Sequence, residues 1–218
     1  MTHANEHILS DGWLLDAASG AAPRAIRVLA ACQAELRPEA GARMGAAEAA
    51  FGALLETAPV ASLRADALAS TLAQLDDAQP SAAAPVADRD PVIPAVLKRE
   101  MALSLSKQWR RRFGGHSEIV LDSLNEPGVK ARLLSIPPGK GAPEHGHEGE
   151  ELTLVLSGSF HDGQERYGRG DACYANADTI HTPRVDGEEA CICFAVELGS
   201  LKPTNPALAA ANRMISIL

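Results

Sequence analysis

The sequence predicts an α+β protein with two parts, a small N-terminal helical domain and a C-terminal all-β barrel. Apolar residues recur at helical spacing through residues 9–78. A stretch rich in Pro and Ala without periodicity follows over residues 79–97. From residue 98 to residue 218, short apolar runs alternate with Gly, Pro, Asp and Asn, as in an antiparallel barrel or jelly roll. We therefore expect a helical domain at 1–78, a linker at 79–97 and a barrel at 98–218.

Three or four amphipathic helices are expected in the helical part. Gly20 is placed to end the first helix, and Pro23 stands in the first turn of the second. A third helix covers residues 37–56, and Ser62 is placed to cap a fourth. The apolar stripes of the last three helices are Ile26, Leu29, Cys32 and Leu36; Met44, Ala47, Phe51 and Leu54; and Leu68, Leu72 and Leu75. Packing of such stripes against one another would form the core of a small domain.

The barrel is predicted from four runs with strand character. They are VKARLLSIPPG at 129–139, EELTLVLSGSF at 150–160, DACYANAD at 171–178 and EEACICFAVEL at 188–198. No long helical pattern separates these runs, so we expect neighbouring strands to pair in antiparallel fashion.

Composition restricts the class and the compartment. Hydrophobic residues make up 46% of the chain and aromatic residues only 4%, so the core must consist mainly of Ala, Leu, Val and Ile. No stretch approaches the roughly 20 apolar residues that span a bilayer, and the N-terminus lacks the pattern of a signal peptide. The four cysteines include no CxxC pair, so we expect no structural disulfides. These features favour a cytoplasmic protein.

Charge is negative and unevenly distributed. The net charge of −8 argues against direct contact with nucleic acid. Residues 1–90 carry a balance of −6, and residues 91–218 a balance of −2. An acidic helical domain would suit a basic protein partner, although a solvated acidic surface is the commoner explanation.

Two histidines lie one residue apart in EHGHEGEELTLVLSG, residues 144–158. Residues i and i+2 of a strand point to the same face, so His145 and His147 can direct both imidazoles into one cavity. Glu151 has the same parity, whereas Glu150 has the opposite parity and should point away. His181 offers a third imidazole. This set suits tetrahedral zinc if no position stays open, or iron, manganese or nickel if the coordination expands.

The sequence around this pair argues against a polar surface loop that happens to contain two histidines. The first cupin motif is present at unbroken spacing as Gly139, His145, His147, Glu151 and Gly158. The second motif keeps Gly170, Asp171 and His181 but departs from the pattern at Asn176, Asp178 and Val185. We therefore expect a cupin, a double-stranded β-helix or jelly-roll barrel. Its expected metal ligands are His145, His147, Glu151 and His181.

The order of helices, Pro-rich linker and cupin resembles the ChrR-type anti-sigma factors over nearly the full length. The segments ETAPVASLRADALASTLAQLD and HGHEGEELTLVLSGSF carry this resemblance. It implies N-terminal helices that bind an extracytoplasmic-function sigma factor and keep it from RNA polymerase. It also implies a cupin that binds zinc and is needed for release of the sigma factor in response to singlet oxygen or related oxidants. Neither nucleic acid nor membrane is an expected direct partner.

One element of that family is degenerate in this sequence. The family's helical domain holds its own zinc through an early His and a His-x3-Cys-x2-Cys element. Here VLAACQAE places Val28 and Glu35 where a His and a Cys are expected, which leaves Cys32 and His7. Two ligands are too few for a closed site, so we expect one zinc per chain, in the cupin. The helices would then be held by apolar packing alone, with Cys32 as a small core residue.

Cys191 and Cys193 share one face of a predicted strand. If that face is the barrel interior, the two thiols lie near the metal and could respond to oxidation. The simpler interpretation, which we favour, is that two small apolar side chains fill the core.

Three functions are compatible with these patterns. We favour a transcription regulator that binds a sigma factor and senses oxidative stress through its metal site. A metal-dependent cupin dioxygenase acting on a small molecule is the alternative, although it leaves the helical domain without a role. A third hypothesis is a cupin ligand-binding module whose helices form a dimer interface. The sequence does not determine the oligomeric state.

Overall fold

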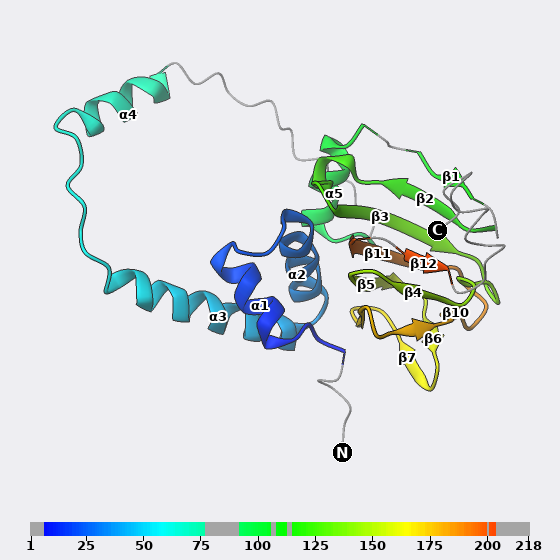
Figure 1. Ribbon diagram of the computed structural model, residues 1–218. Helices are drawn as coiled ribbons and strands as arrows, with labels where there is room; N and C mark the ends of the chain where they lie inside the picture. Colours follow the sequence, from blue (N-terminus) through cyan, green and yellow to red (C-terminus); the bar gives the residue numbers. More distant parts are fainter. Residues whose placement is uncertain (1–6, 77–91, 106–107, 113–114, 200, 204–218) are drawn as a thin grey trace.

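The computed structural model describes residues 7–76, 92–105, 108–112, 115–199 and 201–203. The predicted order of helices followed by a β-barrel is observed, and helices from the N-terminal part pack on one side of the barrel (Figure 1). The expected linker at 79–97 lies mostly outside the described residues. Among the described helices, none is long and apolar enough to cross a membrane.

The described helices are α1 (Asp11–Ser19), α2 (Arg24–Leu36), α3 (Pro38–Glu56), α4 (Ala67–Asp76) and α5 (Ala95–Leu103). Ser10 caps α1 by accepting a hydrogen bond from the Trp13 backbone N–H, and Gly20 ends the helix in a left-handed conformation with φ of 82°. The third helix, expected at 37–56, is observed at Pro38–Glu56, and α2 begins directly after Pro23 and ends at Leu36, the last residue of its predicted stripe.

Two helical boundaries differ from the prediction. Helix α4 starts at Ala67 and is not capped by Ser62. The residues before Ala67 are exposed, so no burial of apolar surface offsets the free-energy cost of forming a first helical turn there. Helix α5 was not predicted, and its first three residues fall inside the expected linker. Its N-terminus is stabilised from outside the local sequence, since the Glu35 carboxylate accepts a hydrogen bond from the Ala95 N–H.

The barrel consists of antiparallel strands in three groups, ordered β1-β2-β3-β11-β5-β8, β10-β6-β7 and β12-β4-β9. Their bounds are β1 (Arg110–Arg111), β2 (Ser117–Val120), β3 (Val129–Ile136), β4 (His145–His147), β5 (Glu150–Ser157), β6 (Phe160–Asp162), β7 (Glu165–Tyr167), β8 (Ala172–Ala175), β9 (Ile180–His181), β10 (Arg184–Val185), β11 (Cys191–Leu198) and β12 (Leu201–Pro203). A short 3-10 helix, η2 (Asp122–Leu124), precedes β3. All four predicted runs form strands, namely β3, β5, β8 and β11.

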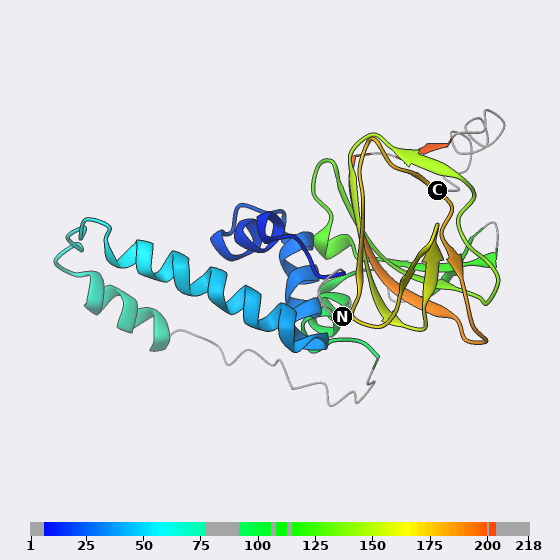
Figure 2. The ribbon, with the colours of Figure 1, turned by 90° about the horizontal axis from the view of Figure 1, so that it is seen from below.

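Helix α2 joins the two parts of the molecule through a common core. Ile26 and Leu29 of α2 are fully buried in the same apolar cluster as Leu133, Leu152 and Phe194 of the six-stranded sheet. Figure 2 shows α2 lying between α3 and the barrel. The helical part and the cupin therefore share one hydrophobic core.

Polar contacts also hold the helices to the barrel, so the expectation of apolar packing alone was wrong. The amide of Gln33 is completely buried and donates to the carbonyls of His7 and Gly170. The Arg37 guanidinium donates to the Asp171 carboxylate over 2.6 Å. Both contacts depend on the close approach of α2 to the turn before β8, which local sequence patterns do not reveal.

The second half of α3 and the whole of α4 extend away from the barrel, and we call residues 48–76 the arm (Figure 2). Of the predicted α3 stripe, Ala47 is buried and Met44 packs against the shared core, whereas Leu54 and the stripe of α4 lie outside it. Leu54, Leu68, Leu72 and Leu75 are all more than half exposed, because no other described segment packs against them. The arm thus presents unpartnered apolar side chains on two helices.

Candidate metal centre

The four predicted ligands converge inside the barrel. His145 and His147 lie on β4, Glu151 on β5 and His181 on β9, and their ligand atoms all lie within 4.8 Å of one another. Pairing of β4 with β9 places His145 directly opposite His181. His145 and His147 are 3% and 2% exposed, so this arrangement is shielded from bulk water.

Hydrogen bonds determine which ring nitrogen carries the proton in two of the imidazoles. His145 Nδ1 lies 2.8 Å from the carbonyl of Pro143, and His181 Nδ1 lies 2.6 Å from the Asp162 carboxylate. Each of these partners can only accept from the ring, so each Nδ1 carries the proton and each neutral ring has its lone pair on Nε2. The two Nε2 atoms face each other across 3.1 Å. Two lone pairs that converge in this way repel each other unless a cation lies between them.

His147 provides the third imidazole of the cluster. His147 Nε2 lies 3.0 Å from His181 Nε2. Burial lowers the pKa of both His145 and His147, which favours the neutral form that binds a metal. The residues present therefore fit a divalent transition metal held by three nitrogens and one carboxylate.

The carboxylate is oriented by its neighbour on the same strand. Thr153 Oγ1 donates to Glu151 Oε1 over 3.0 Å. Glu150 points away from the cluster, as its parity predicts, and accepts a hydrogen bond from the Tyr174 hydroxyl on the exposed side. Glu151 is thus the carboxylate that faces the histidines.

Asp162 is a candidate site residue that sequence reasoning missed. Its carboxylate fixes the ring of His181, the role that outer carboxylates have around many metal-binding histidines. Asp162 ends β6, which belongs to a different strand group from β4 and β9, and it lies outside both cupin motifs. No spacing in the sequence singles it out.

Comparisons with known proteins agree with the cupin fold of the barrel and identify the family. A family model described as the ChrR cupin-like domain matches residues 98–201. The anti-sigma-E factor ChrR of Cereibacter sphaeroides is 41% identical over 191 residues, which cover 87% of this chain and 88% of that protein.

The chain belongs to the ChrR family of anti-sigma factors.

Solved structures include one relative of this anti-sigma factor at nearly full length. The crystal structure of Rhodobacter sphaeroides SigE in complex with the anti-sigma ChrR matches with a TM-score of 0.74 and 37% identity, covering 88% of this chain and 98% of that one. An RmlC-like cupin protein from Ralstonia eutropha JMP134 matches with a TM-score of 0.40 and 19% identity, covering 51% of this chain and 85% of that one.

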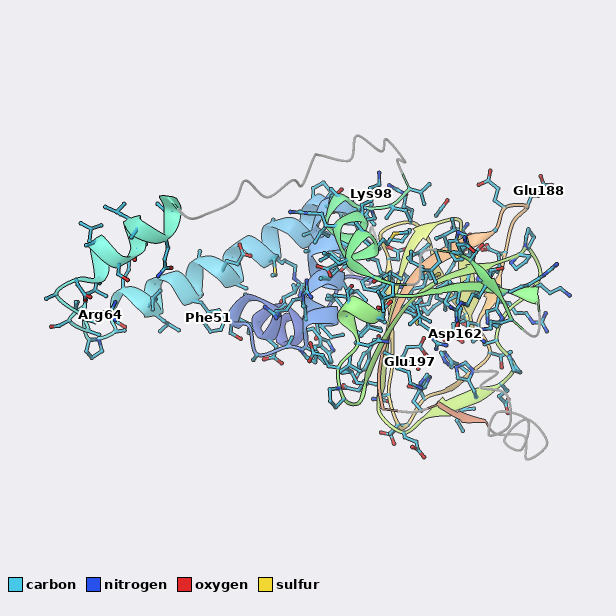
Figure 3. The ribbon with its side chains drawn as sticks, turned by 90° about the horizontal axis from the view of Figure 1, so that it is seen from above. Phe51, Arg64, Lys98, Asp162, Glu188 and Glu197 are labelled. Carbon is cyan, nitrogen blue, oxygen red and sulfur yellow. The ribbon has the colours of Figure 1, made fainter. Side chains whose placement is uncertain are left out.

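In this ChrR-type chain a cavity of about 480 Å³ opens beside the four-residue cluster. His145, Glu151 and His181 line it together with apolar side chains. Arg132 and Glu197 also line the cavity and form an ion pair with each other. Asp162 and Glu197 are both labelled in Figure 3, where they lie in the barrel, well away from the arm.

Cys191 and Cys193, for which core packing was favoured over a redox role, face the barrel interior. Cys191 Sγ and Cys193 Sγ lie 3.4 Å apart, and both residues are almost completely buried. The hydrogen bond with Cys191, followed by burial, raises the pKa of Cys193 well above its usual value. Burial raises the pKa of Cys173, which also lines the cavity, to about 12. Neutral thiols in an apolar cluster favour packing over nucleophilic chemistry.

Three residues at or near the degenerate zinc motif of the helical domain, Cys32, Glu35 and His7, make other contacts in the structure. Cys32 is completely buried in the shared core, as predicted, and burial strongly raises its pKa. Glu35, at the place of a family cysteine, caps α5. The ring of His7 lies against Tyr167 with centroids 4.4 Å apart. These three residues are therefore engaged separately. Within the described residues, the one group of His, Cys, Asp and Glu side chains close enough to share a metal ion is the cluster in the barrel.

Proposed function

We propose that this anti-sigma factor binds an extracytoplasmic-function sigma factor through its helical part and responds to oxidative stress through a zinc ion in the cupin. The observation that carries the proposal is the combination of an exposed apolar arm with a buried three-histidine, one-glutamate cluster in a single chain. The relative of known structure was solved as a complex with SigE, which supports a sigma factor as the partner. Because sigma factors act on RNA polymerase, we place this protein in the cytoplasm.

The arm is the proposed contact surface for the sigma factor. Leu55 and Leu72 are 75% and 52% exposed, and exposed apolar side chains on neighbouring helices are typical of a partner-binding surface. Residues 1–90 also carry a net charge of −6, which complements a basic partner. The sigma factor would bury these leucines and remove the energetic cost of their exposure.

Co-purification tests this surface. The full-length chain is co-expressed with extracytoplasmic-function sigma factors of its host, and the complex is measured by gel filtration and by titration. The double variant Leu55→Asp/Leu72→Asp should weaken binding by at least about 100-fold, because it places two charges in an apolar contact. Leu103→Asp is the matched control, since Leu103 is 65% exposed but lies on α5. Equal binding by both variants would exclude the arm as the contact surface.

Zinc is the proposed metal. Three neutral imidazoles and one carboxylate match its preferred ligands, and a four-coordinate site needs no further ligand from the cavity. Iron, manganese and nickel accept the same donors, so elemental analysis of protein expressed without added metal decides the identity. We expect about one zinc per chain. Iron as the major metal would instead favour the dioxygenase alternative, for which the adjacent cavity would hold the substrate.

Oxidant sensing is tested on the assembled complex. The purified complex with the sigma factor is exposed to photochemically generated singlet oxygen, and release is followed by fluorescence anisotropy of a labelled sigma factor. Release should occur from the zinc-loaded wild-type complex. It should be lost in a His145→Ala/His147→Ala variant that still binds the sigma factor. Release that is equally fast in this variant would show that the signal does not pass through the metal centre.

A further inference from the structure

We propose that the barrel cavity, which adjoins the metal centre and is lined in part by His145, Glu151 and His181, binds a small monocarboxylate with an apolar body. The volume of about 480 Å³ lies within the range of pockets that hold small organic molecules. Much of the wall is apolar and is provided by Leu134, Ile136, Phe160 and Val185. Such a wall suits a hydrocarbon or aromatic body and gives a hydrophilic solute little to bind.

The charges of the lining indicate the sign of the ligand. The charged residues that line the cavity, apart from histidines, are the cations Arg132, Lys140 and Arg184 and the carboxylates Glu151 and Glu197. Arg132 pairs with both Glu197 and Glu118, and Glu118 also pairs with Arg112. This network of two cations and two carboxylates is neutral. The remaining side chains leave an excess of one positive charge, and a divalent cation held by the cluster would increase it. The cavity therefore attracts anions whether or not the metal is bound.

Lys140 is the proposed partner of the carboxylate. Lys140 is one of the residues that line the cavity, and it is exposed, which places it at the opening. Within the described part of the chain, no carboxylate lies within ion-pair distance of its ammonium group. Its backbone is fixed independently, because the Lys140 carbonyl accepts from the Val185 N–H over 2.8 Å and its N–H donates to the Pro137 carbonyl over 3.1 Å. The side chain can thus be changed without disturbing the loop.

This arrangement places the two ends of the ligand in different surroundings. The carboxylate lies at the opening beside Lys140, and the apolar body lies inside among Leu134, Ile136, Phe160 and Val185. The proposed contacts include no bond to the metal.

Calorimetric titration of the full-length, metal-loaded protein with octanoate tests the site, with octan-1-ol as the uncharged probe of similar shape. We expect saturable one-to-one binding of octanoate and clearly weaker binding of the alcohol. Lys140→Met should weaken octanoate binding by about fivefold, as expected for loss of one partly exposed ion pair. Lys130→Met is the matched control, because Lys130 is exposed on β3 and does not line the cavity, and it should have no effect.

A second variant tests the apolar end. Leu134→Trp should fill the cavity and abolish octanoate binding, while the metal content and the circular dichroism spectrum stay unchanged. The proposal is overturned if octanoate shows no saturable binding, if the alcohol binds as tightly, or if Lys140→Met leaves the affinity unaltered. Metal content and sigma-factor binding are measured on the same preparations, so failure here is distinguishable from failure of the proposed function.

Discussion

The side-chain amide of Gln33 donates a hydrogen bond of 3.0 Å to the backbone carbonyl of Gly170, a residue 137 positions further along the chain. This contact joins helix α2 to the turn that precedes β8. Gly170 itself has φ of +87°, and a Cβ there would lie 2.8 Å from Arg37 Cγ, so a glycine is needed for the helix to approach. The same glycine opens the second cupin motif, which links the motif to the docking of the helices.

Gln33 should be essential for stability because its amide satisfies three buried backbone groups. It donates to the carbonyls of His7 and Gly170 and accepts from the Leu9 N–H. Gln33→Leu leaves these groups unpaired, and we expect a loss of about 3 kcal/mol in the free energy of unfolding. Urea denaturation measures it, with the exposed Gln74→Leu as control. A loss no larger than that of the control would contradict the role of this contact.

Removal of two ligands should empty the metal centre. We expect His145→Ala/His147→Ala to reduce the bound metal from about one ion per chain to near zero, because two of four donors are lost. The exposed His161→Ala provides a matched histidine control and should keep its metal. Mass spectrometry of the native protein and elemental analysis give the stoichiometry. Full metal content in the double variant would refute the ligand assignment.

Asp162 should contribute to metal affinity without being a ligand. Asp162→Asn removes the negative charge that holds the Nδ1 proton of His181, and we expect affinity to fall by about tenfold or more. Competition with a chromophoric chelator measures the change. Asp178→Asn, an exposed carboxylate in the loop before β9, serves as the comparison. If both variants bind equally, the hydrogen bond to His181 does not tune the site.

The thiols of the barrel should be unreactive while the protein is folded. With a pKa of about 12, only about one Cys173 side chain in ten thousand is a thiolate at pH 8. Iodoacetamide should therefore label Cys173, Cys191 and Cys193 only after denaturation, as mass spectrometry would detect. Rapid labelling of native protein would favour a redox role for Cys191 and Cys193 over our proposal that they fill the core.

The same shifts predict how stability depends on pH. The folded-state pKa values of Cys173 and Cys193 are raised, so their contribution is complete below the pKa of an unfolded cysteine, about 8.5. As pH rises from there towards about 12, the unfolded chain loses these protons first and the free energy of unfolding should decline. Denaturation curves between pH 7 and pH 10 check the sign, and Cys173→Ala should make the decline shallower.

Local patterns in the sequence were sufficient for the first three helices, for the four long strand runs and for the side-chain directions at the candidate metal centre. Residue parity along β4 and β5 places His145, His147 and Glu151 on one side and Glu150 on the other, because the side-chain direction in a strand depends only on position. The ends of α1 and α3 are likewise encoded within a few residues, by Ser10, Gly20 and Pro38.

Other features depend on contacts between segments that are distant in the sequence, and only the tertiary structure decided them. Asp162 reaches His181 because two strand groups meet inside the barrel, and Glu35 caps α5 from 60 positions away. The leucine stripe of α4 has helical spacing whether it is buried or exposed, so periodicity predicted the helix but not its solvent exposure. Periodicity reports local geometry, whereas burial and pairing depend on which surfaces the folded chain brings together.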